Sequence, residues 1–272
     1  MPYIEVMNKK MYYQEHGQGE TVVFLNGLMM STANWSPFIK VLSSEYRIIL
    51  LDFLDQGRSA EIYSQYTQEM HVDVLKEFLE KLNCDKVHIF GVSYGGEVAQ
   101  LFTLKYGEMV KSLILSNTTS YTDKYMQEIE RSWDYAASTK DASIFFSVVM
   151  PRIYSAKFYE ENYEWLKKNR ESFEKLFDEE WYERFRRAVK SSHDLNITDR
   201  IHEIKVPTLI ISGELDTITP LKYQEVIYNE ISNSKWVVIK DAGHALMYEK
   251  PYEFISVIMG FIKIIGFDIK TI

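Results

Sequence analysis

One serine stands in a sequence pattern that suits a covalent nucleophile. Gly91-Val92-Ser93-Tyr94-Gly95 is the only Gly-x-Ser-x-Gly match in the chain, and it lies between an apolar run and a helical pattern. A serine at the tip of a sharp strand-to-helix turn exposes its Oγ, and the flanking glycines avoid collisions with the neighbouring backbone. The N-terminus of the following helix offers free N–H groups to a developing oxyanion. The segment therefore predicts attack on a carbonyl group, with a glycine-rich turn that only packs as the alternative.

Short apolar runs alternate with helical patterns along the chain, as a mostly parallel sheet with helices on both faces requires. Continuous rather than alternating apolarity predicts strands that are covered on both faces. A hairpin of Tyr3–Met7 and Lys10–His16, turning at Asn8 and Lys9, precedes these runs. The strands predicted after the hairpin are Val22–Leu25, Arg47–Leu51, Val87–Phe90, Leu113–Leu115, Thr208–Ile211 and Trp236–Ile239.

Prolines mark the start of two helices in the last third of the chain. Thr219 followed by Pro220 predicts an N-cap and a first helical position, opening a helix that continues through Ile231. Pro251 predicts the start of a last helix that ends near Lys263.

One long stretch breaks the alternation of strands and helices. Between about Tyr121 and Lys205 no strand pattern occurs, and the helical patterns are rich in aromatic and charged residues. Two amphipathic faces are expected there, one of Phe173, Leu176 and Phe177 and one of Tyr182, Phe185 and Val189. We therefore expect a core formed by residues 1–120 and 206–272, and an all-helical insertion of residues 121–205.

These features resemble the α/β-hydrolase superfamily. The similarity rests on the turn around Ser93 and on the loops described next, and it covers essentially the whole chain outside the insertion. The resemblance implies an α/β fold with a mostly parallel eight-stranded sheet, helices on both faces and an inserted helical lid. In this family the nucleophile follows the fifth strand, where counting places Ser93, and the chain order is serine, acid, histidine.

The resemblance also identifies two partners for Ser93. The family carries its acid after the sixth or the seventh strand; Ser116–Ser120 offers no carboxylate, whereas Asp216 occupies the acid position of a G-x-x-D-x-x-x-P loop. Glu214 is the rival acid, but beside a turn glycine it is expected to be exposed or to cap locally. His244 follows the last strand, where the family carries its base, and an acid partner would hold its imidazole in one tautomer.

The resemblance implies two backbone donors for an oxyanion hole, the N–H groups of Leu28 and Tyr94, each worth roughly 10²–10³ in rate. Relatives usually carry His-Gly where this chain has Asn26-Gly27. The donor is a backbone group, so the change preserves it, and the Asn26 side chain can rebuild hydrogen bonds of the loop. In the structural motif D-x-x-G-x-G-x-S, Asp55 replaces the first glycine, which requires a gentler backbone or a left-handed aspartate.

Composition limits the partners, the metal sites and the cellular location that this chain can have. The 31 Lys and Arg against 39 Asp and Glu give a net charge of −8, which argues against nucleic acid as a partner. The single cysteine, Cys84, excludes an internal disulfide and a C-x-x-C metal site. The first residues lack a secretory pattern, and Lys263, Asp268 and Lys270 interrupt the apolar stretch Phe254–Ile272, so no membrane span and a cytoplasmic location are expected.

We therefore predict a serine hydrolase that cleaves a small or medium carboxylic ester of a small-molecule substrate through an acyl-enzyme, with Ser93, Asp216 and His244 as its triad and without a metal or organic cofactor. The aspartate-nucleophile branches, dehalogenases and epoxide hydrolases, are disfavoured because position 93 is serine. Some aromatic residues of the insertion are expected to line an acyl pocket; the candidates are Trp133, Phe145, Phe146, Tyr154, Phe158, Trp165 and Trp181.

Three alternatives stay open. The first is another reaction of the same fold, namely hydrolysis of a lactone, a thioester or a carbon–carbon bond beside a carbonyl. The second is acyl transfer or perhydrolysis, which depends on what resolves the acyl-enzyme. The third is a ligand-sensing protein that keeps a triad but turns over slowly. The fold alone does not choose among them.

Overall fold

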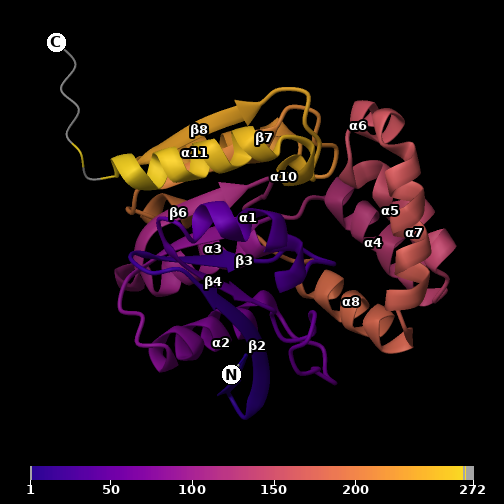
Figure 1. The fold of residues 1–272 in the computed structure, drawn as a ribbon, viewed down its shortest axis with the longest axis horizontal. Coiled ribbons are helices and arrows are strands. Elements are labelled where there is room, and N and C mark those ends of the chain that lie inside the picture. The colour runs from indigo at the N-terminus through magenta and orange to yellow at the C-terminus, as the bar shows by residue number, and fades with distance from the viewer. Residues whose placement is uncertain (1, 266, 268–272) are drawn as a thin grey trace.

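The computed structural model describes residues 2–265 and 267, which form one sheet covered by helices (Figure 1). Eight strands within these residues are arranged in the order β1-β2-β4-β3-β5-β6-β7-β8. The sheet is parallel from β4 to β8, and the β1–β2 hairpin adds to β4 in the antiparallel direction. The strands are β1 (Tyr3–Val6), β2 (Lys9–His16), β3 (Thr21–Leu25), β4 (Arg47–Leu51), β5 (Val87–Val92), β6 (Val110–Ser116), β7 (Thr208–Gly213) and β8 (Ser234–Ile239).

The hairpin turn lies one residue earlier than the sequence predicted. Met7 and Asn8, not Asn8 and Lys9, occupy the turn, with φ angles of 48° and 59°. A two-residue hairpin loop needs positive φ at both central positions, and asparagine adopts such angles more easily than most residues. Lys9 instead pairs with Val6 in the ladder, so β2 begins at that lysine.

Helices cover both faces of the sheet, and each face has its own hydrophobic core. The helices α2 (Gln68–Lys81), α3 (Tyr94–Lys105) and α9 (Leu221–Glu230) pack on one face, with Phe78 and Phe102 fully buried. On the other face lie α1 (Ser36–Leu42), α10 (Leu246–Glu249) and α11 (Pro251–Ile264). The carboxyl ends of the parallel strands lie along one edge of the sheet, and the loops that follow them are therefore close together.

The start of α9 differs from the prediction, whereas α11 begins at Pro251 as expected. Pro220 occupies the N-cap position of α9 and Leu221 is its first residue, so Thr219 does not cap this helix. Thr219 lies one residue before the N-cap and belongs instead to the loop of Asp216, since its N–H and its hydroxyl donate to that carboxylate at 3.0 and 2.7 Å.

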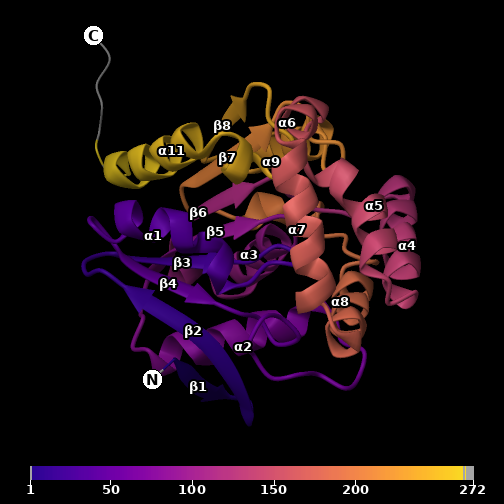
Figure 2. The same cartoon turned by 45° about the vertical axis from the view of Figure 1, so that its right-hand side comes forward.

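Five helices between β6 and β7 form a separate body at one side of the sheet, which we call the helical segment (Figures 1 and 2). They are α4 (Lys124–Ser138), α5 (Ala142–Ile153), α6 (Ala156–Glu161), α7 (Tyr163–Leu176) and α8 (Glu179–Ser191). Four of them begin at a side-chain N-cap: Asp123, Asp141, Ser155 and Asp178. The helices enclose their own core, in which Phe145 is fully buried.

The apolar periodicity of this segment predicted its buried faces only in part. Tyr182, Phe185 and Val189 of α8 lie in the core of the helical segment, as expected. Leu176, at the end of α7, is 68% exposed although it belongs to the same apolar pattern as Phe173. No helix in the described residues is long and apolar enough to cross a bilayer. Two of the three charges expected to interrupt the last apolar stretch, Asp268 and Lys270, lie outside the described residues.

Candidate functional site

Ser93 lies at the point where β5 passes into α3. It occupies the N-cap position of α3 with φ 52° and ψ −121°, a strained backbone conformation for a residue with a side chain. The flanking glycines are required by close backbone contacts. A Cβ on Gly91 would lie 2.3 Å from the carbonyl oxygen of Gly95, and a Cβ on Gly95 would lie 2.3 Å from that of Leu25. The predicted reason for these glycines, collision with neighbouring backbone, is confirmed.

Asp216 and His244 meet at the ends of β7 and β8. Nδ1 of His244 lies 2.8 Å from Oδ2 of Asp216, and both side chains are buried. Oδ1 of the aspartate accepts the N–H groups of Ile218 and Thr219 at 2.8 and 3.0 Å, which leaves Oδ2 for the imidazole and the Thr219 hydroxyl. Burial alone would raise the pKa of Asp216, but the charge and hydrogen bond of His244 and the hydrogen bonds of Thr219 outweigh it and lower this pKa. The carboxylate therefore stays ionised beside the ring.

The other acid considered, Glu214, makes no hydrogen bond to the imidazole within the described residues. It is exposed, and its Oε2 accepts the backbone N–H of Asp241 at 3.0 Å. The local capping expected for this residue is therefore observed.

A buried asparagine that the sequence analysis passed over ties the two loops together. Nδ2 of Asn117 donates to the carbonyl oxygens of Gly243 and His244 at 3.2 and 2.7 Å. Its Oδ1 accepts the N–H of Gly213 at 2.8 Å. The end of β7 and the histidine loop are thus held by one side chain, which sits just beyond β6 with a φ of 44°.

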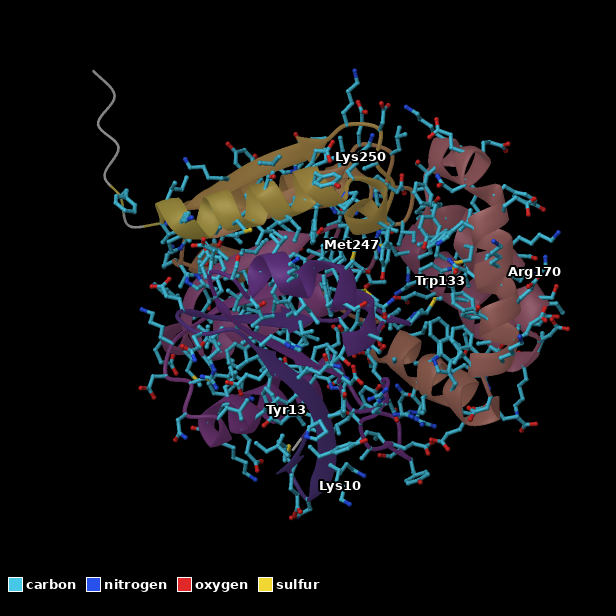
Figure 3. All side chains as sticks on the ribbon, in the orientation of Figure 1. Lys10, Tyr13, Trp133, Arg170, Met247 and Lys250 are labelled. Atoms are coloured by element: carbon cyan, nitrogen blue, oxygen red, sulfur yellow. The ribbon has the colours of Figure 1, made fainter. Side chains whose placement is uncertain are left out.

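Ser93 and His244 both line a cavity of about 560 Å³ between the sheet and the helical segment. Its volume lies in the range of small-molecule sites. No hydrogen bond joins the Ser93 hydroxyl to His244 in the part of the chain that the structure describes, and such contacts are often long before a substrate binds. Trp133 from α4 and Met247 from α10 line it from opposite sides, and Figure 3 shows both at the junction of the two bodies.

The aromatic candidates of the insertion divide into two groups. Trp133, Tyr154 and Trp181 line the cavity. Phe173 and Phe177 line it as well. Of the remaining candidates, Phe145 and Phe146 belong to the core of the helical segment. Phe158 and Trp165 pack against the ring of Tyr154. Four methionines add flexible apolar surface to the cavity wall: Met29, Met30, Met150 and Met247.

The two backbone donors expected for an oxyanion lie beside Ser93. Leu28, Ser93 and Tyr94 together line a small side cavity of about 30 Å³ next to the main one. Among the described residues, the N–H groups of Leu28 and Tyr94 donate to no protein acceptor, so both remain available to a ligand. Asn26 stabilises the loop before Leu28, since its Nδ2 donates to the carbonyl of Leu51 at 2.8 Å and its Oδ1 accepts Nε1–H of Trp35 at 2.7 Å.

The side cavity contains two buried acids that the sequence analysis did not single out. Glu97 lies one turn beyond Ser93 on α3, and Glu130 reaches the same cavity from α4. Burial raises the pKa of Glu97 to about 8; a hydrogen bond from Gln68 opposes this rise and the charge of Glu130 adds to it. Near neutral pH the Glu97 carboxyl is therefore predominantly protonated. No local motif marks this glutamate, because its burial depends on helices from distant parts of the chain.

Asp55 adopts the left-handed conformation that the sequence analysis considered, with φ 66°. Its buried carboxylate accepts the N–H of Ile62 at 2.7 Å and forms an ion pair with Arg187 of α8. In the same motif, Asp52 accepts the N–H groups of Thr32 and Arg58 at 2.6 and 2.9 Å. These contacts are structural, as expected for this motif.

No group of three or more His, Cys, Asp or Glu side chains is arranged to hold a metal ion in the described part of the chain. Three other histidines have partners outside the pair of Asp216 and His244. His71 packs among aromatic rings, His88 bonds to Ser112 at 2.7 Å, and His193 bonds to Glu130 at 2.9 Å.

Comparison with known proteins agrees with the observed fold. The sequence model of the alpha/beta hydrolase fold matches residues 20–251. An alpha/beta hydrolase enzyme from a Medee basin deep-sea metagenome library has a crystal structure that superimposes with a TM-score of 0.96 at 32% identity, covering 99% of this chain and 100% of that one.

Curated relatives carry out different hydrolytic reactions. A proline iminopeptidase of Lactobacillus helveticus is 27% identical over 95% of both chains. The 3-oxoadipate enol-lactonase 1 of Acinetobacter baylyi is 28% identical over 89% of this chain and 88% of its own. The predicted fold and the predicted enzyme class, a hydrolase, are thereby confirmed. On these matches, the chain belongs to the alpha/beta-hydrolase family.

Proposed function

We propose that this protein hydrolyses a small or medium carboxylic ester through an acyl-enzyme on Ser93. The observation that carries the proposal is the buried pair of Asp216 and His244, whose histidine lines the same cavity as a serine on a strained turn. A carboxylate on Nδ1 holds the proton there and leaves Nε2 free to act as a base.

The reaction then proceeds in two halves. Nε2 of His244 takes the hydroxyl proton of Ser93 while Oγ attacks the ester carbonyl carbon, giving a tetrahedral oxyanion that the N–H groups of Leu28 and Tyr94 stabilise. The intermediate expels the alcohol, which receives the proton from His244, and leaves an acyl-enzyme. Water, deprotonated by the same imidazole, attacks the acyl carbon; collapse then releases the carboxylic acid, and His244 returns the proton to Oγ of Ser93.

The helical segment is proposed to be a lid that selects the acyl group. It supplies aromatic side chains to the cavity wall, where Phe177 and Trp181 stack with ring centroids 3.6 Å apart. Together with the methionines, these rings form an apolar surface that favours an uncharged acyl chain.

Lactone hydrolysis is the second candidate, because a lactone is an internal ester and the enol-lactonase relative matches nearly the whole chain. The two candidates use the same triad and differ only in whether the leaving alcohol stays attached to the acyl group.

A panel of p-nitrophenyl esters from acetate to octanoate, a set of lactones and a set of acyl thioesters tests the proposal. We expect turnover of at least one ester or lactone, with a preference for medium acyl chains, and its loss in Ser93→Ala. Equal turnover by Ser93→Ala, or tight binding of ligands with no turnover of any substrate class, would contradict it.

A further inference from the structure

The loop of residues 52–62, between β4 and α2, belongs to the main body and is held against the helical segment by side chains of α8. Arg187 of α8 holds the buried carboxylate of Asp55 in a bidentate ion pair, with Nε to Oδ2 at 2.9 Å and Nη2 to Oδ1 at 3.1 Å. The same Nη2 also reaches Oε1 of Glu61 at 2.7 Å. A bidentate pair fixes direction as well as distance, so this contact orients the loop relative to α8.

A second arginine of α8 holds the same loop by its backbone. Nη2 of Arg184 donates to the carbonyl oxygens of Ser59 at 2.6 Å and Gln56 at 3.4 Å. Arg184 and Arg187 are three residues apart and therefore lie on one face of the helix. A shift of α8 would therefore move the backbone of the loop around Gln56.

Gln56 in turn contacts the loop that carries a proposed oxyanion donor. Its side chain is buried, and Nε2 donates to the carbonyl oxygen of Gly27 at 3.1 Å. The opposite orientation of the amide would place two acceptor oxygens against each other, so the donor must face Gly27. Oε1 has no partner among the described residues, which is unfavourable for a buried carbonyl oxygen. A side chain that served only to pack would not require this amide.

The carbonyl of Gly27 and the N–H of Leu28 belong to the same planar peptide unit, and in the trans form they point in opposite directions. The Gly27 oxygen accepts Nε2–H of Gln56 at 3.1 Å and the backbone N–H of Met30 at 3.3 Å, and hydrogen bonds that fix this oxygen also fix the direction of the Leu28 N–H. Accepting a hydrogen bond polarises the peptide unit as well, which strengthens the N–H as a donor.

We propose that Gln56 is a positioning residue for the oxyanion donor Leu28 N–H, and that Arg184 and Arg187 transmit the position of the helical segment to that donor through the loop of residues 52–62. The proposal rests on the proposed function, because it requires Leu28 N–H to bind the oxyanion.

Gln56→Met is the direct test, because it keeps the side-chain length and removes the donor. Gln65→Met is the matched control, since Nε2 of Gln65 also donates to the backbone of the helical segment, at Arg187, but within the described residues it makes no hydrogen bond to Gly27. We expect Gln56→Met to lower kcat/KM roughly tenfold, less than the 10²–10³ expected for complete loss of an oxyanion donor. A trifluoromethyl ketone, which forms a tetrahedral adduct, should bind more weakly by the same factor, while the carboxylic acid product should bind as before.

The link to the helical segment is tested by a double-mutant cycle. Asp55→Gly combined with Arg187→Met removes both partners of the Asp55–Arg187 pair, so neither of these two charges is left buried alone, and glycine suits the left-handed backbone at this position. Glu61 loses Arg187 as well, and Glu61→Gln is therefore included in the same variant. If the coupling runs through Gln56, this variant should lower kcat/KM in the parent protein but have little further effect in the Gln56→Met background.

Three results would overturn the proposal. Gln56→Met could leave kcat/KM and inhibitor affinity unchanged, it could weaken product and trifluoromethyl ketone equally, or the cycle could be strictly additive. Failure of the proposed function is distinguishable from these, because the parent protein would then show no covalent modification of Ser93 by a fluorophosphonate and no turnover to compare.

Discussion

Replacing Asp216 by Asn separates the chemical role of this residue from its structural one. Oδ1 accepts two backbone N–H groups, so an asparagine will keep its carbonyl oxygen on that side. Its amide nitrogen must then face Nδ1 of His244, where Oδ2 lies at 2.8 Å. An N–H that points at Nδ1 forces the imidazole proton onto Nε2, and the ring can no longer accept the proton of Ser93.

The expected cost follows from this change of tautomer. We expect kcat to fall about 10⁴-fold, which corresponds to about 5 kcal/mol of transition-state stabilisation, with little change in KM. The assay is steady-state hydrolysis of the best ester from the panel, with circular dichroism to verify folding. Glu214→Gln, two residues earlier and exposed, is the matched control and should keep parental activity. Activity of a folded Asp216→Asn protein within tenfold of the parent would refute the assignment of the acid.

Three further predictions concern the surroundings of the site. Asn117→Ala removes the hydrogen bonds that join Gly213 to the loop of His244, and we expect urea unfolding to show a loss of about 1–3 kcal/mol together with a lower kcat. Glu97, whose pKa burial raises to about 8 from 4.5, binds more protons in the folded than in the unfolded state between these values, so the unfolding free energy of the parent should fall as pH rises through this window. Urea unfolding of Glu97→Gln at both ends of the window should show that this fall has disappeared; an unchanged slope would refute the assignment. Trp181→Ala opens the apolar wall and should raise KM for medium-chain esters while leaving KM for the acetate ester nearly unchanged; a uniform effect on all chain lengths would contradict an acyl pocket there.

The residues nearest the proposed chemistry were predictable because local patterns mark them. Ser93 has glycines that the turn requires, and Asp216 and His244 each follow a strand in the order of the family. Strand positions were also predictable, because burial on both faces gives continuous apolar runs.

The supporting contacts were not predictable, because they join distant parts of the chain. Asn117 contacts Gly213 and His244 across 96 and 127 positions, and Arg187 reaches Asp55 across 132. The spacing of residues within one helix or strand gives no information about such distant pairs. Thr219 shows a different kind of failure, since the cap pattern was present but hydrogen bonds from its N–H and its hydroxyl hold this residue in the loop of Asp216, one position before the helix cap.

The central claim is that Ser93 is an activated nucleophile. Intact-mass and peptide mass spectrometry after treatment with a fluorophosphonate, on the parent protein and on Ser93→Ala, test it most directly. We expect one adduct on the parent, located on Ser93, and none on the variant. A folded parent protein that stays unlabelled, or an adduct at another serine that persists in Ser93→Ala, would contradict the claim.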